Sequence, residues 1–183
     1  DVVASAKRPC WEGVGAPPKR RDWELYAQDL IDHLQTQDGG PVIGIGHSMG
    51  ATITALAARQ RPDLFSALVL IEPAMVSPAL ALLMKCLPKS LVSRVDPARV
   101  TLSKPDRWAE RADFEAAMRS DRTYKRFSDE AMSALLEHAV VEDDDGVRRR
   151  FPIAWEAHNY PQPPHILPLL RKLPQPMVAV RGR

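Results

Sequence analysis

The chain has 183 residues, with 25 lysines and arginines against 23 aspartates and glutamates and a net charge of +2. Hydrophobic residues make up 45% of it, which suffices for a folded core and excludes wholesale disorder. The small net charge gives no reason to expect a nucleic-acid partner. Two cysteines, Cys10 and Cys86, are too few for a disulfide scaffold. No apolar run approaches the roughly 20 residues of a membrane span, and we expect a cytoplasmic protein.

The first predicted elements are a short strand and an amphipathic helix. Val2–Ala6 is an apolar run typical of a strand. After a loop rich in Pro and Gly, apolar residues recur with helical spacing at Trp23, Tyr26, Ala27, Leu30, Ile31 and Leu34. We expect Asp22 to cap this helix and Gly39-Gly40-Pro41 to end the segment.

An alternation of strands and helices follows. Val42–Gly46 is predicted to be a buried strand, and about Met49–Gln60 a helix whose small face of alanines can lie close to a sheet. Ala67–Ile71 is apolar on both alternating faces, which is typical of a central parallel strand. Short connections between these elements predict an α/β fold with a parallel sheet and right-handed crossovers.

The composition changes after Glu72-Pro73, and from Ser77 to about His165 no strong core strand is predicted. Helical patches occur instead, at Ala79–Cys86, at Phe114, Ala117 and Met118, and at Met132, Leu135, Leu136 and Ala139 with Ser128 or Asp129 as cap. Ile166–Leu173 is expected to be a helix and Met177–Val180 the last strand. The sequence therefore predicts a core over residues 1–76, a helical insertion over 77–165 and a return to the core over 166–183.

One motif carries chemistry, the G-x-S-x-G sequence Gly46-His47-Ser48-Met49-Gly50 between a predicted strand and a predicted helix. So tight a turn would strain Ser48 at its apex, and Gly46 and Gly50 would leave room for neighbouring backbone. The Ser48 hydroxyl would then stand at a helix N-terminus, where the Met49 N–H can stabilise an oxyanion. The other interpretation is a glycine-rich turn with an incidental serine. A phosphate-binding loop does not fit, because the glycine spacing differs and no Walker lysine follows.

Residues Arg21 to Pro73 resemble the middle of an α/β-hydrolase. The resemblance lies in the helix with Trp23, Ala27, Asp29 and Leu30, in the nucleophile elbow around Ser48, and in the strand end Leu68–Pro73. It implies that the four predicted strands are strands 4 to 7 of that fold, and that the insertion is the family's cap domain. Phe151-Pro152 and Trp155–Ala157 resemble the return segment of that cap domain in esterase-like members.

The resemblance implies a serine hydrolase that cleaves a carboxylic ester or related acyl bond through an acyl-enzyme on Ser48. Its substrate would be a small, hydrophobic ester, and no cofactor or metal is needed. In this family the catalytic acid follows strand 7 and the histidine follows the last strand. We therefore expect the chain to be an internal piece of a longer protein that lacks both groups and is inactive by itself.

Other residues are weaker candidates for the missing roles. His47 should point away from the nucleophile, and His33, His138, His158 and His165 are expected to be packing or surface residues. Glu72 is an alternative acid, because some hydrolases of this fold carry their acid at the end of strand 6.

Two other functions stay open, a C–C bond hydrolase that uses the same serine and a non-catalytic binding protein of the same fold. The acidic turn Glu142–Gly146 fails as an EF-hand, because Val141 and Pro152 would occupy ligand positions. No spacing of Cys and His residues suggests zinc.

Overall fold

The structure is a computed structural model that describes residues 17, 23–88, 96–160 and 164–182. The described residues form two compact units. One comprises 23–88, 159–160 and 164–182, and the other comprises 17 and 96–158. The strand expected at Val2–Ala6 and the expected helix cap at Asp22 lie outside the described residues.

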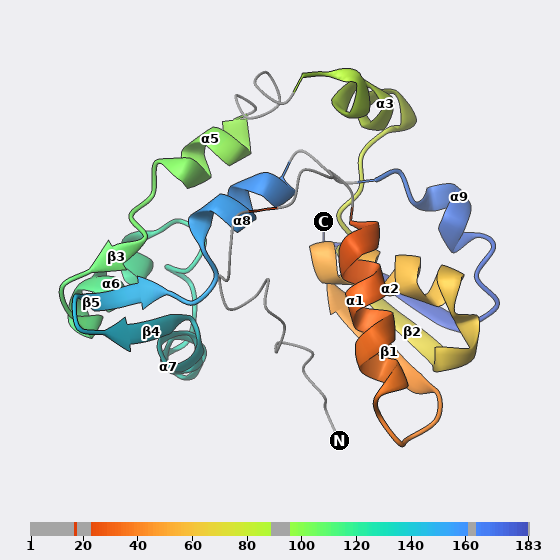
Figure 1. Cartoon of the computed structure of the whole chain (residues 1–183), viewed down its shortest axis with the longest axis horizontal. Coiled ribbons are helices and arrows are strands. Elements are labelled where there is room, and N and C mark those ends of the chain that lie inside the picture. The colour runs from red at the N-terminus through yellow and green to blue at the C-terminus, as the bar shows by residue number, and fades with distance from the viewer. Residues whose placement is uncertain (1–16, 18–22, 89–95, 161–163, 183) are drawn as a thin grey trace. The chain divides into compact units, whose positions relative to one another are not determined.

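The first unit is built on a parallel sheet in which β2 (Phe65–Ile71) lies between β1 (Val42–His47) and β6 (Met177–Val180). β1 and β6 both run parallel to β2 (Figure 1). The three strands expected in this part of the chain are confirmed, and so is the central position of β2 among them. Parallel strands place their carboxyl ends at one edge of the sheet, where the connecting loops gather.

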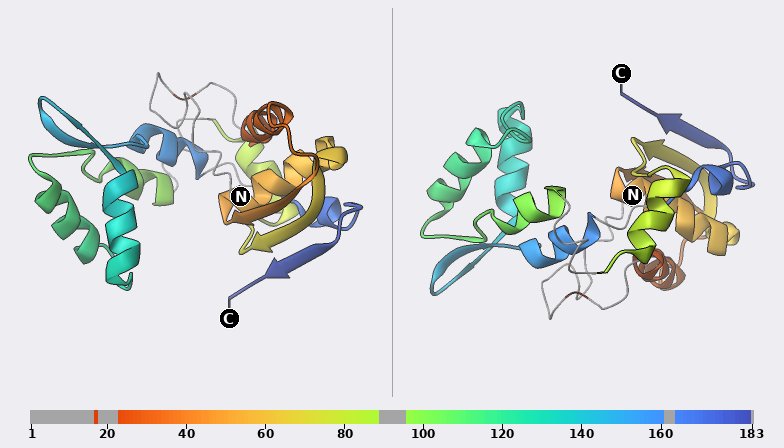
Figure 2. Two further views of the ribbon diagram at one scale, coloured as in Figure 1. Left: turned by 90° about the horizontal axis from the view of Figure 1, so that it is seen from below. Right: turned by 90° about the horizontal axis from the view of Figure 1, so that it is seen from above.

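Helix α2 (Met49–Gln60) covers one face of this sheet, together with α1 (Glu24–Gln35) on the same side (Figure 2). Its alanines at 51, 55 and 58 are fully buried, as expected of a small helix face. The approach is close, because a Cβ on Gly44 of β1 would lie 2.7 Å from the Thr54 side chain. On the opposite face of β1, Ile43 and Ile45 remain 61% and 67% exposed.

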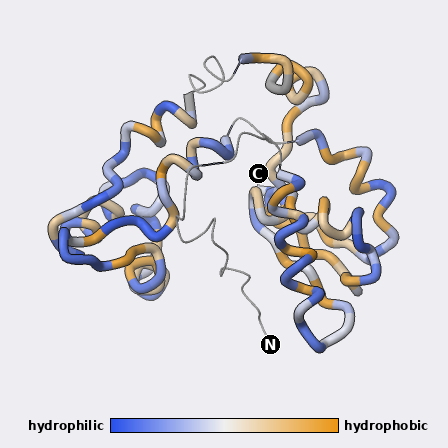
Figure 3. Tube along the Cα trace, viewed as in Figure 1, coloured by the Kyte–Doolittle hydropathy of each residue, from blue (hydrophilic) through white to orange (hydrophobic). Residues whose placement is uncertain are grey.

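The other elements of this unit are the 3-10 turn η1 (Pro62–Leu64), α3 (Pro78–Cys86) and α9 (Leu167–Leu170). α3 is apolar along its length (Figure 3) and belongs by its contacts to the unit with the parallel sheet. α9 is shorter than the helix expected over Ile166–Leu173. It ends at Leu170, and a turn follows in which the Lys172 N–H donates to the Leu169 carbonyl at 2.9 Å.

The second unit is mostly helical but contains a small antiparallel sheet. Its helices are α5 (Asp96–Leu102), α6 (Arg111–Ser120), α7 (Asp129–His138) and α8 (Ile153–Asn159), the last residue of which belongs to the first unit. The strands are β3 (Arg107–Trp108), β4 (Val140–Asp143) and β5 (Gly146–Arg149), in the order β3-β5-β4. The sequence predicts no strong core strand between Ser77 and His165, and it does not indicate these short strands of two to four residues.

The missed strands β4 and β5 form a hairpin around the acidic turn. Asp143 pairs with Gly146, which leaves a two-residue loop between them. Gly146 has a φ of +114°, and a Cβ there would lie 2.4 Å from the Trp108 carbonyl oxygen. Glycine is thus required for the close approach of β3. With strands of two to four residues, the period-2 pattern is too short to stand out from the sequence.

A hydrophobic cluster joins the helices and strands of this unit. It consists of Phe114, Met118, Met132, Val140 and Val147, and the Trp108 ring stands edge-on to Phe114 with centroids 4.8 Å apart. The helical faces expected around Phe114 and Met132 are confirmed as core. The Ser128 hydroxyl caps α7 by accepting from the Ala131 N–H.

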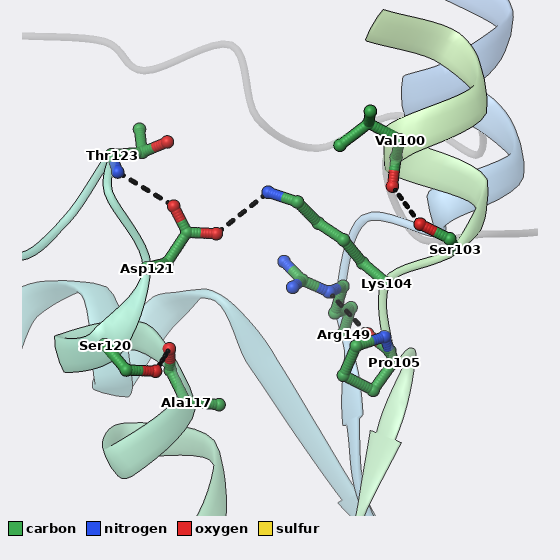
Figure 4. A network of polar contacts seen from close by, with 9 residues as sticks. All are labelled: Val100, Ser103, Lys104, Pro105, Ala117, Ser120, Asp121, Thr123 and Arg149. Atoms are coloured by element: carbon green, nitrogen blue, oxygen red, sulfur yellow. Dashed lines mark hydrogen bonds and ion pairs between the residues drawn. The ribbon is translucent and has the colours of Figure 1, made fainter. Parts of the chain in front are cut away.

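An ion pair ties the end of α5 to the end of α6. Lys104 Nζ lies 2.9 Å from Asp121 Oδ2, and the Thr123 N–H donates to Oδ1 of the same carboxylate at 2.8 Å (Figure 4). The Lys104 ammonium, and next the Thr123 N–H, lower the pKa of Asp121 from 3.8 to about 2. In the same view, Arg149 Nε donates to the Pro105 carbonyl at 3.2 Å.

We predict that Asp121→Asn destabilises this unit at neutral pH and has little effect near pH 2. A folded-state pKa below the unfolded value stabilises the fold above pH 3.8, and this contribution is lost as the pH falls towards 2. Because the pair is partly exposed, we expect a loss of about 1 kcal/mol at pH 7. Urea unfolding at pH 7, 4 and 2.5 measures it. Asp129→Asn, at a side chain 92% exposed, is the control. An equal loss at every pH would contradict the assignment.

Candidate active site

Ser48 occupies the single residue between the end of β1 and the start of α2. Its φ of 53° and ψ of −120° lie in a region that residues with a side chain rarely adopt. Among the described residues other than glycine, Glu72 is the only other one with a positive φ. Such strain costs on the order of 1–3 kcal/mol and persists only where the surroundings hold it.

Backbone hydrogen bonds hold this turn against the last residue of β2 and the segment that follows it. The Ser48 N–H donates to the Ile71 carbonyl at 2.9 Å, and the Ala74 N–H donates to the Ser48 carbonyl at 3.1 Å. The buried Thr52 hydroxyl donates to the Ala74 carbonyl at 2.6 Å and so fixes the same segment to α2. The sequence analysis missed Thr52, because a threonine one turn into a helix has no distinctive pattern.

The two glycines of the motif differ in what they permit. A Cβ on Gly46 would lie 2.6 Å from the backbone N and Cα of Ala51, so only glycine fits beneath the first turn of α2. A Cβ on Gly50 would meet no atom of the described residues within 4 Å. The expectation that Gly50 leaves room for neighbouring backbone is therefore wrong, because its Cα faces away from the packed surface.

The N-terminus of α2 gives the site its electrostatic character. The first N–H groups of a helix have no partner within it, and together with the helix dipole they attract negative charge. No acidic residue lies in the first turn of α2 to offset this potential. Among the described hydrogen bonds none comes from the Met49 N–H. That N–H is free to donate to an anionic oxygen beside Ser48.

His47 lies on the other side of the sheet from α2. Along β1 the buried residues Gly44 and Gly46 alternate with exposed ones, and His47 continues the exposed series of Ile43 and Ile45. The side chains of neighbouring strand residues point to opposite faces. The arrangement agrees with the expectation that His47 does not serve Ser48.

The remaining histidines make other contacts. His33 in α1 is half-buried, His138 is exposed at the end of α7, and the His158 ring packs against Trp155. His165 Nδ1 lies 2.9 Å from the Val76 carbonyl oxygen.

Glu72 directly follows β2, at the same edge of the sheet as Ser48. It is exposed, and its φ is +47°. Its N–H donates to the Val180 carbonyl at 2.8 Å, and its carboxylate accepts a hydrogen bond from the Gly182 N–H. The structure thus brings the motif residues and Glu72 to one edge, while a role of Glu72 as catalytic acid stays a prediction.

Two further properties bear on the site. Among the described residues, no three His, Cys, Asp or Glu side chains form a group that could hold a metal ion. In that same part of the chain, none of the helices has both the length and the apolar character needed to traverse a bilayer.

Comparison with known proteins decides the family. The model of the alpha/beta hydrolase family matches residues 5–180. The chain belongs to the alpha/beta hydrolase family. Among solved structures, this chain is similar to E-2-(acetamidomethylene)succinate hydrolase, with a TM-score of 0.65 and 24% identity over 91% of this chain and 57% of that one. At that identity the likeness shows the fold alone.

Curated relatives match over shorter stretches of this chain. The monoglyceride lipase of Rattus norvegicus is 36% identical over 90 residues, which is 46% of this chain and 29% of the lipase. A type I acyl-CoA thioesterase of Penicillium roqueforti is 34% identical over 106 residues, 55% of this chain and 22% of the thioesterase. The matches thus span less than a third of the length of these two relatives.

We predict opposite effects on stability for alanine at the two motif glycines. Gly46→Ala forces its methyl group into the backbone of α2 and should cost about 3 kcal/mol or more, as severe overpacking does. Gly50→Ala meets open space on a helix and should stabilise by about 0.5–1 kcal/mol. Urea unfolding of the two variants measures both changes. Equal losses would contradict the difference in packing.

Proposed function

We propose that the whole protein is a serine hydrolase that cleaves a carboxylic ester or a related acyl bond through an acyl-enzyme on Ser48. The observation that carries the proposal is the strained backbone of Ser48 at the N-terminus of α2, with a φ of 53°. Strain of this kind is retained where the surrounding structure holds it, and it concentrates at functional sites. The lipase and the thioesterase among the relatives act on acyl bonds by name, which supports the same chemistry here.

The mechanism begins with attack of Ser48 Oγ on the carbonyl carbon of the substrate. The carbonyl π electrons move to oxygen, and the resulting oxyanion accepts a hydrogen bond from the Met49 N–H. Collapse of this intermediate expels the alcohol or thiol and leaves an ester on Ser48. Water then attacks the same carbonyl and releases the carboxylic acid, which restores the hydroxyl.

A serine hydroxyl needs a base to lose its proton. His47 directly precedes Ser48 but belongs to the exposed series of β1, and His165 Nδ1 lies against the Val76 carbonyl oxygen. We propose that the histidine and its acid come from parts of the whole protein outside this chain. This is consistent with the partial overlap, since the chain covers 57% of E-2-(acetamidomethylene)succinate hydrolase. No cofactor or metal enters the proposed reaction.

The same relatives and the apolar character of α3 support a proposal for the substrate class. Leu82 and Leu83 on that helix are more than half exposed, which favours a small hydrophobic ester over a charged substrate. The cytoplasmic location and the hydrophobic substrate remain predictions. Hydrolysis of p-nitrophenyl esters of increasing acyl length, beside a thioester and a carbon–carbon substrate, would rank the acyl classes.

We expect the full-length protein to react covalently with a fluorophosphonate at Ser48 and to hydrolyse a p-nitrophenyl ester. Ser48→Ala should abolish labelling and lower turnover by at least about 10³-fold, because no other group can form the acyl-enzyme. Mass spectrometry of the labelled peptide and steady-state rates measure the two effects. Ser133→Ala, at an exposed position of α7, is the matched control. A folded protein without labelling or turnover would favour the non-catalytic binding function.

A further inference from the structure

Glu72 sits where the backbone must change direction at the carboxyl edge of the sheet. Its φ of +47° is one of only two positive values among the described residues that are not glycine. A glutamate at positive φ has a higher conformational free energy than asparagine or glycine would have in the same backbone conformation. The surrounding contacts, therefore, have to account for it.

The backbone groups on the two sides of the Ile71–Glu72 peptide bond make hydrogen bonds to different neighbours. The preceding carbonyl, of Ile71, accepts from the Ser48 N–H at 2.9 Å, which holds the nucleophile turn. The Glu72 N–H donates to the Val180 carbonyl at 2.8 Å, which extends the pairing of β2 with β6 by one residue. Glu72 is thus the joint between the Ser48 turn and the end of β6.

The side chain adds a third connection at the same joint. The Glu72 carboxylate accepts a hydrogen bond from the N–H of Gly182, two residues beyond the last residue of β6. A Cβ on Gly182 would lie 2.6 Å from Glu72 Oε1, so a side chain at that position would push the carboxylate out of this contact. The carboxylate therefore fixes the direction in which the chain leaves β6.

We propose that Glu72 is a positioning residue, whose carboxylate clamps the segment that leaves β6 beside the Ser48 turn. In parallel α/β sheets the loops at the carboxyl ends of the strands form the binding site, so the direction of this segment governs what it presents to Ser48. The inference rests on the proposed hydrolase function for its kinetic effect. The clamp itself is a property of the fold.

A clamp of this kind needs a hydrogen-bond acceptor and not a charge. The amide oxygen of glutamine can accept the same bond from the Gly182 N–H, whereas alanine cannot. A catalytic acid would behave differently, since loss of its charge in Glu72→Gln would impair the base that it orients. Glutamine and alanine at this position therefore distinguish the two roles.

The test uses Glu72→Gln, Glu72→Ala, Gly182→Ala and the double variant Glu72→Ala/Gly182→Ala in the full-length protein. We expect kcat for a p-nitrophenyl ester to fall by about 10- to 100-fold in Glu72→Ala and in Gly182→Ala, with KM little changed, because a small misplacement of a site segment costs about that much. The double variant should fall no further than either single one. Glu72→Gln should retain at least a third of kcat and the wild-type pH profile.

Hydrogen exchange provides a readout that does not depend on activity. Amides 180–182 should exchange faster in Glu72→Ala than in the wild type and in Glu72→Gln. Glu137→Ala removes a glutamate whose side chain is 74% exposed and serves as the control for both measurements. Fluorophosphonate labelling of Ser48 reports on the hydrolase function separately.

Three results would overturn the clamp. They are a loss in Glu72→Gln as large as in Glu72→Ala, additive losses in the double variant, and unchanged exchange of residues 180–182 in Glu72→Ala. The first of these would instead assign Glu72 as the charged acid. Absence of both labelling and turnover in the wild type would reject the proposed function, and the exchange data would then decide the clamp alone.

Discussion

The site depends on one constraint, the left-handed turn at Ser48 between a strand and a helix. That turn is unfavourable by itself. It persists because the Ser48 N–H donates to the carbonyl of Ile71, the last residue of β2, and the Ser48 carbonyl accepts from the Ala74 N–H. The central position of β2 makes this possible, since its carboxyl end lies next to that of β1. The order of strands in the parallel sheet therefore determines the backbone geometry of Ser48.

Much of the first unit could be predicted because its signals are local and mutually consistent. Val42–Gly46 and Ala67–Ile71 are continuous apolar runs within β1 and β2, and the glycines and alanines around Ser48 indicate close contact between helix and sheet. The motif placed Ser48 correctly between strand and helix. It could not show that Gly46 alone is sterically required, because the environment of Gly50 is set by tertiary packing.

The rest could not be predicted for physical reasons that differ from place to place. The β4–β5 hairpin has a core made of side chains far apart in sequence, such as Phe114 and Val147, and its strands are too short for a visible period. The two roles proposed for Glu72, catalytic acid and positioning residue, differ in the group that its carboxylate contacts. Gly182, its partner, lies 110 residues along the chain, and no local pattern connects the two.

Ile43 and Ile45 on the uncovered face of β1 have an energetic consequence. Burying an isoleucine side chain contributes about 1.5–3 kcal/mol, so covering both would add roughly 3–6 kcal/mol. That sum is comparable with the whole stability of many small domains. Within the described residues, the strain at Ser48 is thus supported by a strand that leaves two large apolar side chains exposed on one face. Any element that packs on this exposed face of β1 would make the strand before Ser48 more rigid without contacting a reacting atom.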